Sequence, residues 1–338
     1  MAPGASSRRR RGLALAGLSA ALLGSTPVLG KIALAAGLAP LAVVFLRTSA
    51  ATLLLLIVLL PRRGALAIFP LGLLGCLLAG FLNGIGSIFF YAGLARVAAG
   101  VGQMLFGLYP VWIALVLFLD GQRPSRISLA ALALSLPAVY LITSARWQQV
   151  DPLGAVCMVL AGLLFGLHIL LNERVLYEVP APTVAFYTLA AMTLVVGPAF
   201  LLFGRPPAEV APQALPAMIG LAAITFVSRV ALFSGVKSIG GLQSALLGMA
   251  EVLVAVALSH LVLGESLTRA QQLGGLLLVG ALLLSGLDRT PYRRLHGRGW
   301  LYWLRPPVPA GPLAPPTQPI VRSRESPSPQ DDSLSPAP

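Results

Sequence analysis

The chain has 338 residues, of which 57% are hydrophobic and 10% are charged, and its mean hydropathy is +0.86. A soluble domain carries roughly 25% charged residues, so this composition excludes an ordinary soluble protein. The net charge of +13 does not indicate nucleic-acid binding, because the basic residues lie between apolar runs and in the two tails, not on a patch with interleaved aromatic residues.

The chain begins with a basic segment, residues 1–11, which contains Arg8 to Arg11. Together with the apolar stretch that follows it and the small residues Ala33 to Ala36, this segment also resembles a secretory signal peptide. Cleavage would leave nine spans and would remove the first element of the repeat described below. We therefore expect the first helix to be retained.

The apolar runs are roughly 18 to 25 residues long, which is the length that a helix needs to cross a bilayer. They do not alternate, and an open sheet could not satisfy its backbone in lipid. The sequence therefore predicts an all-α membrane protein with ten transmembrane helices, at residues 12–30, 39–60, 68–91, 98–119, 127–144, 153–172, 183–203, 214–235, 241–263 and 270–287.

The basic residues are distributed unequally between the two sets of loops, which predicts the orientation of the helices. If the N-terminus is cytoplasmic, that side receives Arg8 to Arg11, Arg62, Arg63, Arg123, Arg126, Arg174, Lys237, Arg289, Arg293, Arg294 and Arg298. The other side receives Arg96, Arg146, Arg205 and Arg269, with Lys31 at the end of the first span. We therefore expect a multi-pass protein of the plasma (inner) membrane with both termini in the cytoplasm.

The last segment, residues 288–338, holds 12 of the 28 prolines of the chain and several Ser-Pro pairs. A segment of this composition cannot bury enough apolar surface to fold. We expect a Pro/Ser-rich disordered cytoplasmic tail.

The two halves of the chain align at an offset of 142 residues, which places Gly24 on Gly166 and Pro40 on Pro182. Because each copy contains five spans, an odd number, the second copy must cross the membrane in the opposite sense to the first. The sequence therefore predicts two inverted five-helix repeats, residues 12–144 and 153–287, with a solute site near the membrane midplane between them.

Several motifs within these repeats resemble the EamA family of the drug/metabolite transporter superfamily. They are the segment Gly24 to Arg47, with Lys31 and Ala39-Pro40, and the segment Leu263 to Thr268 before Gln272-Leu273-Gly274. The resemblance covers residues 12 to 287 and implies a ten-helix fold, cytoplasmic termini and solute transport, often export, without ATP hydrolysis. The sequence departs from the family pattern in two places: Asp120-Gly121-Gln122 stands in place of Gly-Glu, and Val252 follows Glu251 where the family usually has a proline.

The residue pattern predicts neither an enzyme nor a cofactor or metal site. His168, His260 and His296 have no carboxylate pair or nucleophile at usable spacing. Cys76 and Cys157 each lie in an apolar run without a second cysteine or histidine at metal-ligand spacing. We read both cysteines as packing residues.

Glu251 is the acidic residue placed near the middle of a predicted span, on a helical face with Ser244, Gly248 and Ala255. A buried carboxyl is costly and requires a reason. Two interpretations stay open: Glu251 lines a cavity, or it forms a structural pair with an arginine of a neighbouring helix. In the first, burial favours the neutral acid and a nearby arginine favours the carboxylate, so Glu251 is a candidate proton carrier.

Spans three and eight carry polar residues at positions that the repeat offset relates. Thr225 aligns with Asn83, and Arg229 aligns with Ser87. This correspondence favours a shared substrate or ion pathway, with independent hydrogen bonding between helices as the alternative. Tyr91 extends the face of span three, with a buried aromatic as the alternative.

Arg47 lies inside span two, where it would recognise an anionic group or pair with a carboxylate. For His168 and Asn172 on span six we expect packing and local hydrogen bonding.

The leading functional hypothesis is a secondary transporter, an exporter, that carries a small metabolite or drug-like solute by alternating access. The rival is a non-transporting receptor or scaffold that acts through the proline-rich tail. The expected partners are a small-molecule solute and the lipid bilayer. Protons or another coupling ion, and a homodimer, are open alternatives.

Overall fold

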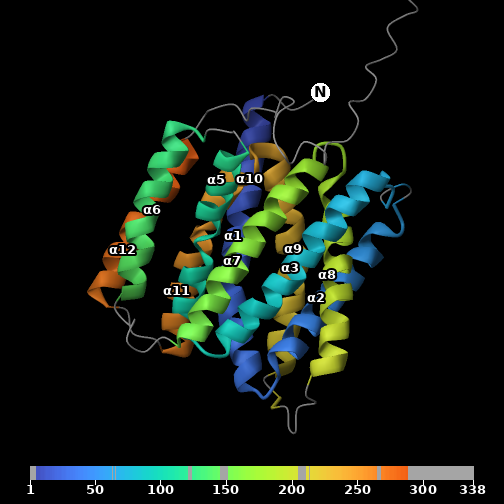
Figure 1. Ribbon diagram of the computed structural model, residues 1–338, viewed down its shortest axis with the longest axis horizontal. Helices are drawn as coiled ribbons and strands as arrows, with labels where there is room; N and C mark the ends of the chain where they lie inside the picture. The colour runs from blue at the N-terminus through green and yellow to red at the C-terminus, as the bar shows by residue number, and fades with distance from the viewer. Residues whose placement is uncertain are drawn as a thin grey trace, which may run out of the picture. The chain divides into compact units, whose positions relative to one another are not determined.

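The structure is a computed structural model that describes residues 5–62, 64, 66–120, 124–144, 151–204, 211–212, 214–264 and 268–287. Within these residues all regular secondary structure is helical (Figure 1). The described helices are α1 (Ala5–Ala35), α2 (Pro40–Leu59), α3 (Pro70–Leu94), α4 (Ala99–Phe106), α5 (Tyr109–Leu119), α6 (Arg126–Ser144), α7 (Pro152–Val175), α8 (Ala181–Phe203), α9 (Ala214–Ile239), α10 (Gly241–Gly248), α11 (Ala250–Leu263) and α12 (Arg269–Leu287).

Eight segments of the described chain are long and apolar enough to cross a membrane. They are α1, α2, α3, α4 with α5, α7, α8, α9, and α10 with α11. The other two predicted spans correspond to α6 and α12, whose apolar stretches, Arg126–Ala138 and Gln272–Ala281, are shorter. The predicted fold, an all-α membrane protein, is confirmed.

Some of the charged residues used to predict the orientation are not in described loops. Arg63, Arg123, Arg146 and Arg205, together with the predicted tail at 288–338, lie outside the described residues. Arg174 follows the predicted end of its span at residue 172, but α7 continues to Val175. Arg174 lies in the last turn of α7, is 3% exposed and pairs with Asp120.

The helix boundaries differ most from the prediction at the N-terminus. Helix α1 begins at Ala5 and includes Arg8 to Arg11, whereas the predicted span begins at residue 12. Hydropathy marks the apolar part of a helix, but backbone hydrogen bonding continues past the edge of the apolar run. The start of α7 is sharper, because Asp151 accepts hydrogen bonds from the backbone N–H groups of Leu153 and Gly154.

The fourth and ninth predicted spans are each divided into two helices, which the sequence analysis missed. Between α4 and α5, Leu108 N donates to Leu105 O at 3.4 Å, and Pro110 has no N–H to continue the helical ladder. Between α10 and α11, Met249 N donates to Leu246 O at 3.2 Å. The repeat offset places Gly107 on Met249, so the two breaks occupy equivalent positions.

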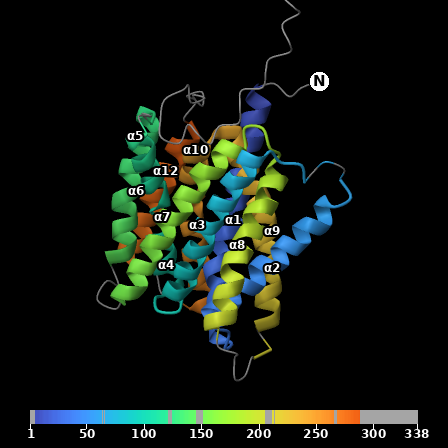
Figure 2. The ribbon, with the colours of Figure 1, turned by 45° about the vertical axis from the view of Figure 1, so that its right-hand side comes forward.

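Helices of one half of the chain pack against helices of the other half, and the repeat offset relates the pairs that are in contact (Figures 1 and 2). Helix α1 packs against α9, and its counterpart α7 packs against α3, the counterpart of α9. In the same way, α1 contacts α11 and α7 contacts α5, while α2 contacts α9 and α8 contacts α3. Helices α2 and α8, and α6 and α12, pack against their own counterparts. Each half of the chain therefore completes the core of the other.

Two aligned glycines allow close approach at equivalent crossings. A Cβ at Gly24 would lie 2.7 Å from the carbonyl oxygen of Glu251, and a Cβ at Gly166 would lie 3.1 Å from that of Tyr109. Each contact falls beside a helix break. The absence of a side chain at these glycines brings α1 and α7 against the broken spans.

Candidate functional site

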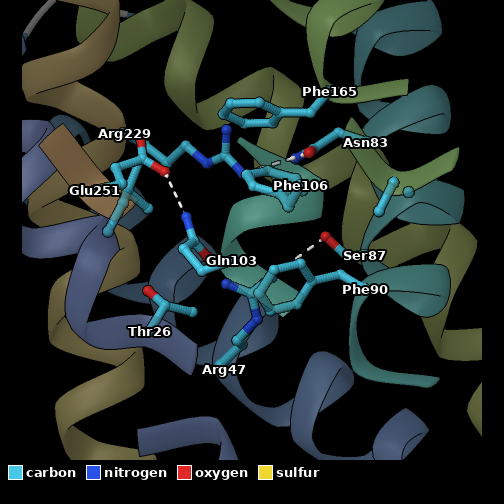
Figure 3. A pocket seen from close by; sticks show the side chains of 13 residues that line it. Thr26, Arg47, Asn83, Ser87, Phe90, Gln103, Phe106, Phe165, Arg229 and Glu251 are labelled. Carbon is cyan, nitrogen blue, oxygen red and sulfur yellow. Dashed lines mark hydrogen bonds between the residues drawn. The ribbon is translucent and has the colours of Figure 1, made fainter. Parts of the chain in front are cut away.

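A cavity of about 50 Å³ lies among seven helices of the described chain. Helices α1 to α4 supply residues from the first half of the chain, and α7, α9 and α11 supply residues from the second half. The polar lining residues are Thr26, Arg47, Asn83, Ser87, Gln103, Arg229 and Glu251 (Figure 3). The apolar lining residues are Leu23, Gly86, Phe90, Phe106, Ala161 and Phe165.

Arg47 on α2 links the polar faces of α3 and α9. Its guanidinium donates from Nη2 to the hydroxyl of Ser87 and from Nη1 to the hydroxyl of Thr225, each at 3.2 Å. The same group lies over the ring of Tyr91, with Cζ 5.1 Å from the ring centroid. The aligned positions 83 and 87 on α3, and 225 and 229 on α9, therefore meet around one site.

Arg229 on α9 makes an equivalent set of contacts on the other side of the cavity. Its Nη2 donates to Asn83 Oδ1 at 3.4 Å, and its Nη1 lies 3.1 Å from His168 Nε2. The guanidinium also lies over the ring of Phe165, with Cζ 5.4 Å from the centroid. In Figure 3, Arg229 and Arg47 approach the cavity from opposite sides, and Gln103 lies between them.

The contacts of His168 fix which of its nitrogens carries the proton. Because a guanidinium can only donate, His168 Nε2 must accept from Arg229 and is unprotonated. The proton then resides on Nδ1, which lies 3.1 Å from the carbonyl oxygen of Ala79. The imidazole is therefore neutral. Asn172 Nδ2 lies 3.1 Å from the same Nδ1 nitrogen and donates to the His168 carbonyl oxygen at 3.0 Å. The predicted local hydrogen bond is therefore present, and Arg229 adds a partner from α9.

Glu251 lies in the first turn of α11, immediately after the break that follows α10. Gln103 Nε2 donates to its carboxyl oxygen Oε2 at 3.1 Å, and the hydroxyl of Tyr109 forms a second hydrogen bond with the carboxyl group. The side chain is buried. Its hydrogen-bonding partners come from both helices of the broken fourth span, α4 and α5.

The charges around the cavity are not balanced by ion pairs. Arg47, Arg229 and Glu251 are 5%, 4% and 3% exposed, so all three are withdrawn from water. Within the described chain, neither guanidinium has a carboxylate oxygen within 4.0 Å. The Nε atoms of both arginines, Thr26 Oγ1 and Gln103 Oε1 are buried without a hydrogen-bond partner.

Of the eight residues predicted for a substrate or ion pathway, five line the cavity: Arg47, Asn83, Ser87, Arg229 and Glu251. Thr225 and Tyr91 are buried and contact Arg47 without being lining residues. Ser244 is buried on α10, outside the lining, and its hydroxyl has no hydrogen-bond partner among the described residues. Within the described chain, Glu251 has no arginine or lysine nitrogen within 4.0 Å. The interpretation of Glu251 as one member of a structural ion pair is therefore not supported.

The sequence analysis missed the contributions of α1, α4 and α7. Gln103, a polar residue inside an apolar run, was detectable by asking for every polar residue within a span. The repeat offset, applied to span one, places Leu23 on Phe165 and Thr26 on His168. Leu23, Thr26 and Phe165 line the cavity, and His168 contacts Arg229. No group of three metal-ligating side chains occurs in the described residues.

Comparison with known proteins gives consistent findings. The model of the EamA-like transporter family matches residues 10–144 and 152–287. An uncharacterized transporter of Archaeoglobus fulgidus is 26% identical over 58% of this chain and 70% of its own length. An uncharacterized transporter of Synechocystis sp. is 25% identical over 64% of this chain and 67% of its own.

A solved crystal structure of a protein has a TM-score of 0.65 and 20% sequence identity to this chain. The similarity covers 83% of this chain and 96% of that one. At this level of identity the structure supports the fold alone.

Proposed function

Because this chain belongs to the EamA-like transporter family, which is not a family of enzymes, we propose that it is a secondary transporter that works by alternating access. It exports a small metabolite or drug-like solute across the plasma membrane. The observation that carries the proposal is the cavity, which is lined by residues from both halves of the chain.

The position of the cavity suits a transport path. In transporters built from inverted repeats, the solute site lies between the repeats, and rocking of one repeat against the other exposes it to each side in turn. Arg47 on α2 and Thr225 on α9 contact each other across this boundary, as do Asn83 on α3 and Arg229 on α9. A relative movement of the two halves would alter these contacts.

The broken spans support the same proposal. Discontinuous helices are common at transporter binding sites, where backbone groups are released from the helical ladder. Gln103 and Phe106 lie at the end of α4 just before one break, and Glu251 lies just after the other. Both breaks therefore lie next to the cavity.

The cavity is small in this structure. A volume of about 50 Å³ accommodates a few water molecules, whereas most small-molecule sites measure about 300 to 1,000 Å³. A metabolite would enter after the two halves move apart.

The excess of basic residues in one set of loops supports cytoplasmic termini.

Alternating access can be tested without knowing the solute. Cys76 and Cys157 are the only cysteines of the chain and both are buried, so replacing both by alanine provides a cysteine-free background. Thr26→Cys in this background places a thiol in the cavity at a residue whose hydroxyl makes no hydrogen bond. A membrane-impermeant thiol reagent, added from either side of oriented vesicles, should modify it.

Ser19→Cys is the matched control, because Ser19 lies on the same helix, is also buried and does not line the cavity. It should remain unmodified from both sides. Modification of Thr26→Cys from one side alone would contradict alternating access and favour a receptor or scaffold.

A further inference from the structure

The charge around the cavity constrains what the cavity can hold. Arg47 and Arg229 carry two positive charges, since a guanidinium does not lose its proton in proteins. Glu251 can offset at most one of them, and His168 is neutral because its Nε2 accepts from Arg229. At least one buried positive charge therefore has no compensating anion within the described residues.

This arrangement differs from a structural ion pair. A buried charge without a partner is strongly unfavourable, in a membrane above all, and it persists where it serves a site. The donors of the two arginines are also not exhausted, because each Nε is buried without an acceptor. An anionic group in the cavity would supply both the missing charge and the missing acceptors.

When Glu251 is ionised, the number of charges indicates a monoanion. Gln103 donates to Glu251 through Nε2, and the hydroxyl of Tyr109 can donate to it as well, so the structure accommodates its carboxylate form. With Glu251 ionised, the cavity carries one net positive charge. One negative charge neutralises it, whereas a dianion such as a phosphate monoester would leave an excess.

The remaining wall of the cavity is apolar and largely aromatic. Phe90, Phe106 and Phe165 all line it, and the Phe106 ring lies 5.1 Å from each of the other two rings, centroid to centroid. These side chains offer no hydrogen bonds, so they suit the hydrocarbon part of a solute. Figure 3 shows them beside the polar groups of the cavity.

We infer that the cavity binds an organic monocarboxylate, with its carboxylate between Arg47 and Arg229 and its apolar body against Phe90, Phe106 and Phe165. This inference rests on the proposed transport function, because it names the class of solute that the same cavity carries. It places no requirement on the direction of transport.

Binding can be measured on the full purified chain in a nonionic detergent. The probes are benzoate, the uncharged isostere benzamide, the cation benzylammonium, and chloride. A solute that binds the folded state raises its apparent melting temperature in a saturable way. Benzoate should do so, and the other three should produce no shift at the same concentration.

Two variants locate the site. Arg47→Gln and Arg229→Gln should each weaken benzoate binding about tenfold or more, since each removes charged hydrogen bonds. Arg96→Gln is the matched control, because Arg96 lies in an exposed ion pair with Asp151 and should bind benzoate like the unchanged chain. If a Gln variant fails to fold, Arg229→Lys and Arg47→Lys keep the charge and should retain weaker binding.

Other outcomes of these binding measurements would contradict the monocarboxylate inference. Equal shifts by benzoate and benzamide, or a shift by chloride that matches that of benzoate, would overturn the monocarboxylate inference. So would unchanged benzoate affinity in both Gln variants. These results leave the labelling of Thr26→Cys unaffected, so a failed inference is distinguishable from a failed transport function.

Discussion

Two groups of buried charges in this protein have opposite arrangements. Arg174 on α7 pairs with Asp120 at the end of α5, with 3.4 Å between Nη2 and Oδ2, and both side chains are almost inaccessible. Arg47 and Arg229 are equally buried, but each is bonded to neutral side chains. The first arrangement offsets its own desolvation, and the second leaves positive charge available.

The difference separates a stabilising role from a functional one. Removing one member of a buried ion pair leaves an uncompensated charge, so such pairs must stay intact for the fold. A buried arginine that lacks a counter-ion already carries the free-energy cost of an uncompensated charge in the folded protein. Its removal should therefore affect solute binding more than stability.

The largest effect is expected at the ion pair. Asp120→Ala leaves the guanidinium of Arg174 buried without this counter-charge, and we expect it to lower the stability of the folded state by about 3–5 kcal/mol. Thermal unfolding in detergent, followed by size-exclusion chromatography, measures this change. The double variant Asp120→Leu with Arg174→Leu should recover most of the loss. Unchanged stability of Asp120→Ala would remove the distinction between the two groups.

The next effect concerns the cavity. Arg229→Met should reduce solute flux at least about tenfold, as expected for the loss of charged hydrogen bonds of ~1.5–3 kcal/mol. It should leave thermal stability unchanged or raise it, because it removes a desolvated charge. Parallel flux and unfolding measurements check both parts. A loss of stability as large as that of Asp120→Ala would contradict the proposed role.

Glu251 tests how the cavity responds to protons. Its carboxyl is faced by Gln103 from α4, Tyr109 from α5 and Arg229 from α9, the last without direct contact. Glu251→Gln mimics the neutral acid at similar volume and should abolish accumulation driven by a pH gradient while it preserves folding. Full pH-driven accumulation by this variant would show that Glu251 is not the proton carrier. Gln103→Glu would not serve as a control, because it adds a charge.

The smallest effect is expected at the exposed pair of Arg96 and Asp151. The Arg96 guanidinium, with hydrogen bonds from the α7 backbone, holds the pKa of Asp151 below its usual value. Any stabilisation by this carboxylate is therefore complete above the unfolded pKa of about 3.9 and is lost as the pH falls through the lower folded value. Arg96→Gln should leave thermal unfolding unchanged between pH 6 and 8. A clear loss in that range would mean that exposed charges matter more than we infer.

The sequence predicts the polar part of the cavity well, for a physical reason. A charged or amide side chain inside an apolar run must face protein rather than lipid, and this identifies Arg47, Asn83, Arg229 and Glu251. It does not predict which of these side chains bond to one another. The contact between Arg47 and Thr225 depends on how α2 crosses α9, which hydropathy does not encode.

The broken helices and the aromatic wall were less accessible from the sequence. Gly107 and Pro110 lie within one apolar run, and hydropathy does not register a lost backbone hydrogen bond. Phenylalanines such as Phe106 and Phe165 are typical of any apolar span, so the residue type does not distinguish a cavity wall from a lipid-facing surface. Only packing against helices from the other half of the chain separates the two.

The central claim is that a solute crosses through the cavity and depends on its two arginines. The most direct test is uptake of a mixture of organic anions and neutral metabolites into proteoliposomes, analysed by mass spectrometry. We predict that an organic monoanion enters vesicles with the unchanged protein and that its uptake is lost in Arg47→Gln with Arg229→Gln. Equal uptake by the folded double variant, or no uptake of any solute by the unchanged protein, would contradict the account.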